Sequence, residues 1–138
     1  MSEENMEAVR RLITAVEERD LAGVLAAYDE NIVIREADSL PYGSEFHGHE
    51  GGERHTLKAL EVWGNLQPPT ERTLNAKFLD AGEDYVIVLW RQKGVNSRGE
   101  KFDAPVVSVY KMRGSKVVES QMFHADTKAL LQFLGREN

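Results

Sequence analysis

The sequence predicts an α+β fold in which a curved sheet surrounds a pocket. Helix-type patterns come mainly before residue 67, whereas most strand-type patterns come after residue 70. Helices gathered first and strands gathered last favour an α+β arrangement over the alternating units of a parallel sheet. The length of 138 residues is close to the commonest domain size, so we expect one domain over residues 1–138.

The composition is that of an ordinary soluble globular protein, with 41% hydrophobic and 29% charged residues. The net charge of -6 and the lack of a basic stripe argue against a nucleic-acid or anionic-membrane partner. The absence of cysteine excludes disulfides and thiolate chemistry. No apolar run approaches the ~20 residues that cross a bilayer, and the acidic start is unlike a signal peptide. We therefore expect a cytoplasmic protein without a membrane partner.

The first 36 residues predict two helices and a strand. Apolar residues at three- and four-residue steps predict an amphipathic helix over residues 3–19. Asp20 is a typical cap for a short second helix, whose apolar face ends at Tyr28. The β-branched run Ile32-Val33-Ile34 then predicts a strand that continues toward Glu36.

A long irregular segment is expected over residues 38–52, which contain Pro41 and four glycines. The spacing of Leu57, Leu60 and Trp63 predicts a third helix from about His55 to Leu66. The prolines that follow at 68 and 69 end it, because proline cannot continue a helix.

The remainder of the chain predicts strands, turns and one short helix. A final helix is expected after a cap at Asp126 or Thr127. The expected strands are Arg72–Leu79, Tyr85–Trp90, Phe102–Met112 and Lys116–Phe123, with turns at 80–83, 96–99 and 113–115.

Two apolar runs point to a second copy of the chain as a partner. Tyr85–Trp90 and Val106–Tyr110 are too apolar for strands with one solvated face, since such strands normally alternate. We expect a homodimer that uses the convex face of the late strands. The residues expected to be largely buried are Leu12, Leu25, Ile34, Trp63, Val88 and Val109.

Several short motifs follow one another along the chain: Arg19-Asp20-Leu21-Ala22-Gly23 with Tyr28, Leu40-Pro41-Tyr42-Gly43 with Phe46-His47-Gly48, Ala104-Pro105 and Lys116-Val117-Val118-Glu119. In this order and spacing they resemble the nuclear-transport-factor-2-like superfamily, which includes SnoaL-like polyketide cyclases and ketosteroid isomerases. The resemblance covers nearly the whole chain. It implies a cone-shaped, strongly bent antiparallel sheet of the cystatin-like type, with the N-terminal helices over its concave face and a small apolar ligand in the cone.

The same resemblance assigns candidate site residues. The isomerases' general base falls on Glu36, whereas their two oxyanion donors fall on Leu12 and Val107. One missing donor typically costs ~10²–10³ in rate, so the steroid isomerase reaction is not expected. His124 falls on a pocket-facing position of the last strand. Other expected ligand-binding residues are Tyr42, Phe46, Ser120 and Met122, together with Leu12 and Val107.

Each candidate also has a structural interpretation. Glu36 could be a solvated carboxylate at a strand end, and His124 could be a core histidine satisfied by backbone. His47, His49 and His55 are close in sequence but lack a defined metal-ligand spacing. We therefore predict no metal site, and no motif indicates a cofactor.

Two functions remain open. The first is a cofactor-free isomerase, cyclase or lyase acting on a small apolar carbonyl compound, with Glu36 and His124 moving a proton. The second is a non-catalytic ligand-binding or dimerising accessory domain, which agrees with the missing oxyanion donors.

Overall fold

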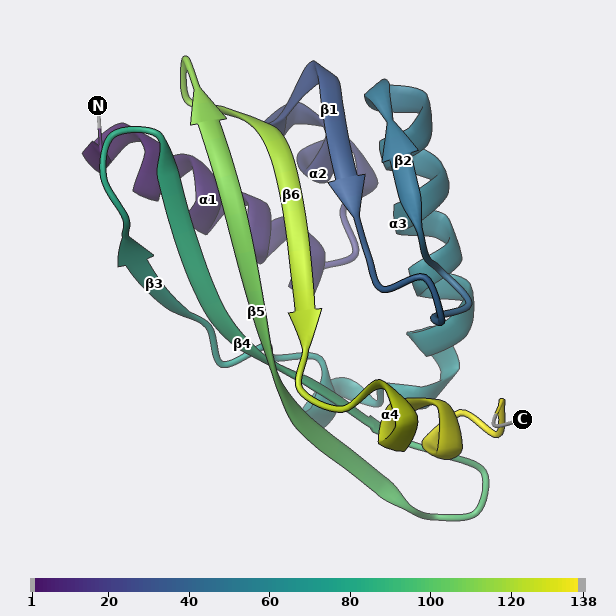
Figure 1. The fold of residues 1–138 in the computed structure, drawn as a ribbon. Coiled ribbons are helices and arrows are strands. Elements are labelled where there is room, and N and C mark those ends of the chain that lie inside the picture. The colour runs from purple at the N-terminus through teal and green to yellow at the C-terminus, as the bar shows by residue number, and fades with distance from the viewer. Residues whose placement is uncertain (1, 137–138) are drawn as a thin grey trace.

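The computed structural model describes residues 2–136, which form four α-helices and one six-stranded sheet. Among these residues, no helix has the length and apolar character needed to cross a membrane. Figure 1 shows the elements, which in chain order are α1 (Ser2–Glu17), α2 (Leu21–Ala27), β1 (Tyr28–Arg35), β2 (Glu45–His47), α3 (Gly48–Trp63), the 3-10 turns η1 (Gly64–Leu66) and η2 (Pro69–Glu71), β3 (Lys77–Asp80), β4 (Tyr85–Val95), β5 (Lys101–Arg113), β6 (Lys116–His124) and α4 (Thr127–Phe133).

The strand order is β2-β1-β6-β5-β4-β3, and the sheet is curved and open. The four strands after residue 70 pair antiparallel, as predicted. However, β1 and β6 are parallel, so the sheet is mixed. The chain leaves β1 through β2 and α3 and re-enters at the far edge with β3. The antiparallel meander from β3 to β6 then brings β6 beside β1 in the same direction.

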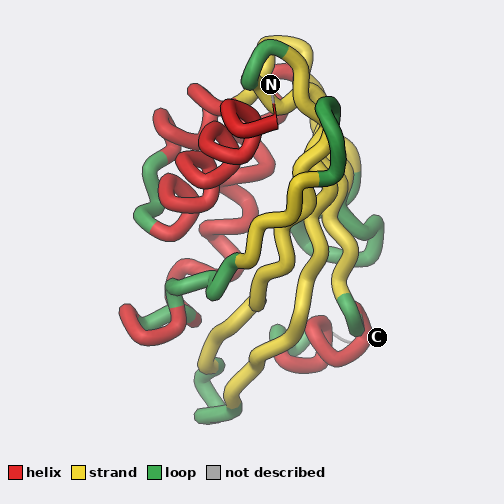
Figure 2. Tube along the Cα trace, turned by 90° about the vertical axis from the view of Figure 1, so that its left-hand side faces the viewer, coloured by secondary structure: helices red, strands yellow, loops and turns green. Residues whose placement is uncertain are grey.

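The helices α1, α2 and α3 cover one face of the sheet (Figure 2). Alternation along the strands turns Val86 and Val88 of β4 toward these helices, where they pack with Leu12 of α1. Leu12, Ile34, Trp63 and Val88 are buried as predicted. Leu25 and Val109 are only half-buried, Val109 because its side chain lies on the opposite face of β5.

Several element boundaries differ from the sequence prediction, among them the end of β4, which lies at Val95 instead of Trp90. Tyr28 opens β1 instead of closing the second helix, because β1 extends along β6 as far as the pair Tyr28 and Val117. The helix α3 begins at Gly48 within the expected loop. The third strand begins at Lys77, five residues after the expected Arg72.

Glycines at the start of α3 allow the helix to lie against the sheet. A Cβ at Gly51 would come within 3.1 Å of the Phe46 backbone, and one at Gly52 would come within 3.0 Å of the Tyr28 ring. These close approaches explain why a glycine-rich segment forms a helix despite its poor intrinsic propensity.

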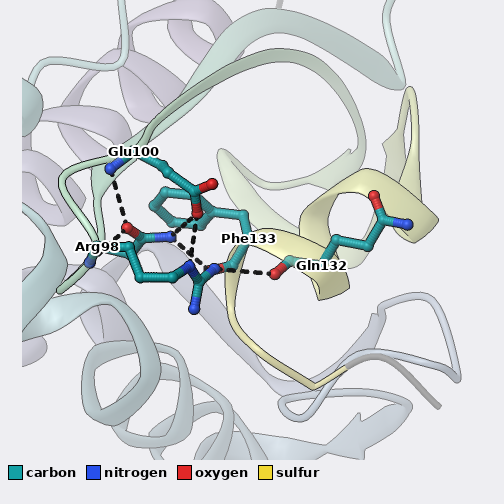
Figure 3. Close-up of polar contacts among 5 residues, drawn as sticks. Arg98, Glu100, Gln132 and Phe133 are labelled. Atoms are coloured by element: carbon teal, nitrogen blue, oxygen red, sulfur yellow. Dashed lines mark hydrogen bonds and ion pairs between the residues drawn. The ribbon is translucent and has the colours of Figure 1, made fainter.

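The short helix α4 is fastened to the β4–β5 hairpin by Arg98 (Figure 3). Its guanidinium donates to the main-chain carbonyls of Gln132 and Phe133, each at 3.3 Å, and forms an ion pair with Glu100 at 2.8 Å. A cation at the carbonyl end of a helix is electrostatically favourable. The attachment holds the Phe133 ring against Trp63, with 5.8 Å between ring centroids.

Candidate functional site

Glu36 follows the last residue of β1 and turns its carboxylate into the space between sheet and helices. Its main-chain N–H donates to the carbonyl of Ser44 at 2.8 Å, which fixes the chain where it leaves the sheet. The residue is 8% exposed. A buried carboxylate of this kind requires partners that offset its loss of hydration.

Two histidines from different elements supply these partners. Nε2 of His55, on α3, lies 3.2 Å from Oε2 of Glu36. Nε2 of His124, the last residue of β6, lies 3.0 Å from Oε1. Because an ionised carboxylate only accepts hydrogen bonds, both Nε2 atoms carry hydrogen and donate. Each carboxylate oxygen of Glu36 therefore accepts a hydrogen bond from a different histidine ring.

These contacts keep Glu36 ionised. Burial acts to raise the pKa of Glu36, but the hydrogen bonds from His124 and His55, with the positive charge of the rings when protonated, act in the opposite direction. The net result is a pKa below the ordinary value of 4.5. Glu36 is thus a carboxylate, able to accept a proton, at neutral pH.

A cavity of about 180 Å³ adjoins Glu36 between the sheet and the helices. Its walls are mostly apolar, and the expected ligand-binding residues Leu12, Tyr42, Ser120 and Met122 all line it. Glu36 and His55 line it as well. The structure therefore brings a carboxylate and an imidazole together at the wall of an apolar chamber.

Three tyrosines add hydroxyl groups to the cavity wall: Tyr28, Tyr42 and Tyr110. Burial and the nearby carboxylate of Glu36 raise the pKa of Tyr28 and Tyr42 above the ordinary range. The same causes raise the pKa of Tyr110 to about 12. All three hydroxyls therefore keep their protons at neutral pH and can donate hydrogen bonds.

His124 lies behind Glu36 and is not among the residues that line the cavity. Its side chain is only 3% exposed, although the main chain at the end of β6 leaves the whole residue half-buried. Its second ring nitrogen, Nδ1, is buried without a partner among the described residues. The edge of the ring meets Trp90, with centroids 6.5 Å apart.

Two further candidate residues lie outside the cavity lining. Val107 pairs with Phe123, and both belong to the alternation set opposite to Ser108 and Met122. Val107 therefore faces away from the cavity, and the position carried over from the isomerases does not hold for it. Phe46 is buried against His55, with ring centroids 5.1 Å apart, and is not among the residues that line the cavity.

The three neighbouring histidines of the sequence have different partners. His47 pairs with Glu45 at 2.8 Å on the surface, and His49 meets the carbonyl of Tyr28 at 2.9 Å. His55 alone reaches Glu36. Within residues 2–136, no group of three or more histidines and carboxylates is arranged to hold a metal ion.

His55 was not predicted as a site residue from the sequence. Residues 38–52 were expected to form a loop, and the helix was expected to begin only near His55. The signal was the four-residue spacing of His55, Ala59 and Trp63, which places them on one face of a longer helix. Gln92 was also missed. It lies on the same face of β4 as Trp90 and lines the cavity.

The family follows from the sequence and the fold together. The sequence matches the family model described as the SnoaL-like domain over residues 9–120. The chain belongs to the SnoaL-like domain family. This confirms the predicted place in the nuclear-transport-factor-2-like superfamily. No curated protein matches the sequence closely enough to be counted as a relative.

Solved structures share the whole fold of this SnoaL-like protein at low sequence identity. TerC, co-crystallised with polyporic acid, is 20% identical with a TM-score of 0.81, over 96% of this chain and 98% of its own. An NTF2-like protein of unknown function from Burkholderia pseudomallei is 23% identical with a TM-score of 0.81, over 95% and 97%. A protein with a ketosteroid isomerase-like fold from Catenulispora acidiphila, in complex with trimethylamine, is 14% identical with a TM-score of 0.71, over 94% and 92%. At these identities the likeness establishes the fold alone.

Proposed function

We propose that this protein binds a small, mostly apolar carbonyl compound in the cavity and moves a proton on the carbon next to the carbonyl. Glu36 takes the proton from that carbon and returns it to the same or another carbon, as a cofactor-free isomerase, cyclase or lyase requires. One observation carries the proposal: a buried, ionised carboxylate lies at the wall of an apolar cavity.

The two histidines have different roles in this proposal. His55 lines the cavity, so it can pass a proton between Glu36 and the ligand or polarise the ligand. His124 touches Glu36 from outside the cavity lining, so it positions the carboxylate without meeting the ligand. The sequence-based assignment of His124 to catalysis is thereby reduced to a positioning role.

A non-catalytic ligand-binding domain is the second candidate. It is favoured by the engagement of both Glu36 oxygens with histidines, which leaves the carboxylate weakly basic. The positions that hold the isomerases' oxyanion donors are also occupied by Leu12 and Val107. Under this alternative the cavity holds the same class of ligand without turnover.

Hydrogen–deuterium exchange distinguishes the two candidates. The bicyclic ketone 2-tetralone is incubated with the protein in D₂O, and NMR follows the loss of its protons next to the carbonyl. We expect the wild type to exceed the buffer rate, and Glu36→Gln to lower the catalysed rate by about 10²–10⁴-fold. Glu45→Gln is the matched control, because Glu45 also contacts a histidine but is exposed. Binding of the ketone without catalysed exchange would support the non-catalytic alternative.

We also propose that the partner of this chain is a second copy. The sheet face away from the helices carries exposed or half-buried apolar residues from four adjacent strands. Large apolar areas of this kind are uncommon on monomers. The apolar face is formed by Leu79, Tyr85, Ile87, Leu89, Val107, Val109 and Phe123.

A further inference from the structure

Gln92 is a buried amide inside the cavity without a protein partner. It is 7% exposed and lines the cavity, yet its side chain forms no hydrogen bond with residues 2–136. A side-chain amide offers two N–H donors and an acceptor oxygen. The amide atoms are not among the fully enclosed atoms without a partner, so they face the cavity space, where water or a ligand can bind them.

Two other polar side chains of the cavity have partners of their own. Gln67, which also lines the cavity, donates its amide to the carbonyl of Lys93 at 3.0 Å. Trp90, which also lines the cavity, donates from Nε1 to the hydroxyl of Ser108 at 2.8 Å. Gln92 differs from Gln67 and Trp90 in this respect, because its amide has no hydrogen-bond partner among residues 2–136.

Tyr42 offers a second donor on the wall of the same cavity. Its oxygen accepts from Nε1 of Trp63 at 3.1 Å, so its own proton is free to point toward a ligand. The Trp63 ring covers Gly94, which is two residues beyond Gln92 on the same face of β4. Tyr42 is also beside His55, with ring centroids 6.3 Å apart. Trp63 thus links the surroundings of Tyr42 to those of Gln92.

We infer that Gln92 and Tyr42 bind the carbonyl oxygen of the ligand, by N–H and O–H hydrogen bonds respectively. This inference rests on the proposed function, in which Glu36 acts on the carbon next to that carbonyl. Hydrogen bonds to the oxygen stabilise the negative charge that develops when the neighbouring carbon loses its proton. Gln92 and Tyr42 thereby supply, from other positions, the donors that are absent at Leu12 and Val107. The ligand class is a neutral ketone or ester, polar at one end and apolar elsewhere.

A matched pair of ligands tests this inference. 2-Tetralone and tetralin have the same bicyclic frame and differ by the carbonyl group. In calorimetric titrations, Gln92→Met should weaken the binding of 2-tetralone about 3- to 10-fold, which is the usual contribution of one neutral hydrogen bond. The binding of tetralin should not be weakened. Gln67→Met is the control, because it makes the same change at an amide that already has a partner. It should leave the preference for the ketone unchanged.

The infrared band of the bound carbonyl provides a second readout. Hydrogen bonds lower its stretching frequency, so the band should move up in Gln92→Met and in Tyr42→Phe. An unchanged affinity and frequency in Gln92→Met would overturn the inference and assign water to the amide. Equal weakening of both ligands would also overturn it, because the change would then be one of cavity shape. If the wild type binds neither ligand, the proposed function fails together with the inference. If Gln92→Met behaves as expected while Glu36→Gln leaves proton exchange unaltered, only the proton transfer fails.

Discussion

At the scale of single residues, the arrangement around Glu36 shows how a charge is kept in an apolar interior. The carboxylate is almost covered, and each oxygen has a ring N–H donor. Removing one partner of a buried pair normally costs more than the pair contributes, because the remaining charge is left uncompensated. The three side chains should therefore behave as one unit under mutation.

The depressed pKa of Glu36 predicts how stability depends on pH. The unfolded chain takes up a proton near the ordinary value of 4.5, whereas folded Glu36 resists protonation. The resulting stabilisation is present above about pH 4.5. It is lost as the pH falls through the pKa of Glu36 in the folded protein, which is lower than in the unfolded chain. Urea unfolding between pH 6 and 3 should show the wild type losing stability faster than Glu36→Gln. Parallel pH profiles for the two proteins would show that the Glu36 pKa is not depressed.

Substitutions at His124 should separate a positioning role from simple packing. His124→Ala leaves Oε1 of Glu36 without its donor and should destabilise the protein by about 1–3 kcal/mol. His124→Gln keeps an N–H in place of Nε2 and should recover part of this stability and of the proton exchange. Thermal melts and the exchange assay measure both effects. Equal behaviour of the two variants would contradict a role for the hydrogen bond.

The sequence allowed Glu36 to be assigned, because a gapless count from Asp20 and Tyr28 reaches the end of the first strand. His124 was placed correctly on the last strand, and the alternation of that strand turns it inward with Ser120 and Met122. Whether His124 lines the cavity depends on how Glu36 and Trp90 pack around its ring. Such tertiary packing cannot be predicted from the periodicity or the spacing of residues in the sequence.

At the scale of elements, α3 decides the composition of the site, because it carries both His55 and Trp63. Glycines let this helix approach the sheet, and a further glycine, Gly94 of β4, receives the Trp63 ring. Trp63 in turn holds Tyr42 and packs on Phe133 of α4. Trp63 thus ties together α3, β4, α4 and the segment that carries Tyr42.

This packing predicts the effect of adding a methyl group at Gly94. A Cβ there would lie 3.0 Å from the Trp63 ring and 3.1 Å from the carbonyl of Leu66. Gly94→Ala should destabilise the protein by about 1–3 kcal/mol and alter the near-ultraviolet dichroism of tryptophan. Gly64→Ala is the control, because its Cβ would meet only ordinary contacts, from 3.4 Å outward. Urea unfolding of both variants measures the difference, and an unaffected Gly94→Ala would contradict the tight packing of Trp63.

The kind and order of the elements were predicted where apolar spacing is regular, as α1 and the meander after residue 70 show, although the start of β3 and the end of β4 were each misplaced by five residues. The start of α3 was missed because glycine is a poor helix former, and only the contacts of Gly51 and Gly52 explain its use. The parallel pairing of β1 and β6 was missed as well. It depends on the path of the entire chain, not on any local pattern.

At the scale of the whole molecule, the two faces of the sheet have different roles. The helix-covered face encloses the cavity, whereas the opposite face presents the apolar residues proposed as a dimer interface. Phe123 is 53% exposed and pairs with Val107 on the neighbouring strand, and Val107 in turn pairs with Leu89 on the next strand. Its neighbour in sequence, His124, contacts Glu36, so the two faces meet at the end of β6.

The dimer proposal predicts a change of mass on substitution of Phe123. Light scattering at micromolar concentration should give twice the chain mass of 15.6 kDa for the wild type. Phe123→Asp should shift the protein toward the monomer, because it places a charge among the apolar residues of the interface. Leu60→Asp is the control, since Leu60 is an exposed apolar residue on the helix side. A monomeric wild type would contradict the proposal.

The cavity beside Glu36 is the proposed binding place of a small apolar carbonyl compound, and methionine methyl groups report on such binding directly. Met122 lines the cavity, whereas Met6 and Met112 pack elsewhere in the core. We expect titration of methyl-¹³C-methionine protein with 2-tetralone to shift the Met122 resonance in a saturable way and to leave those of Met6 and Met112 in place. Saturable shifts at Met6 or Met112 without one at Met122, or no shift at any of the three, would contradict the account.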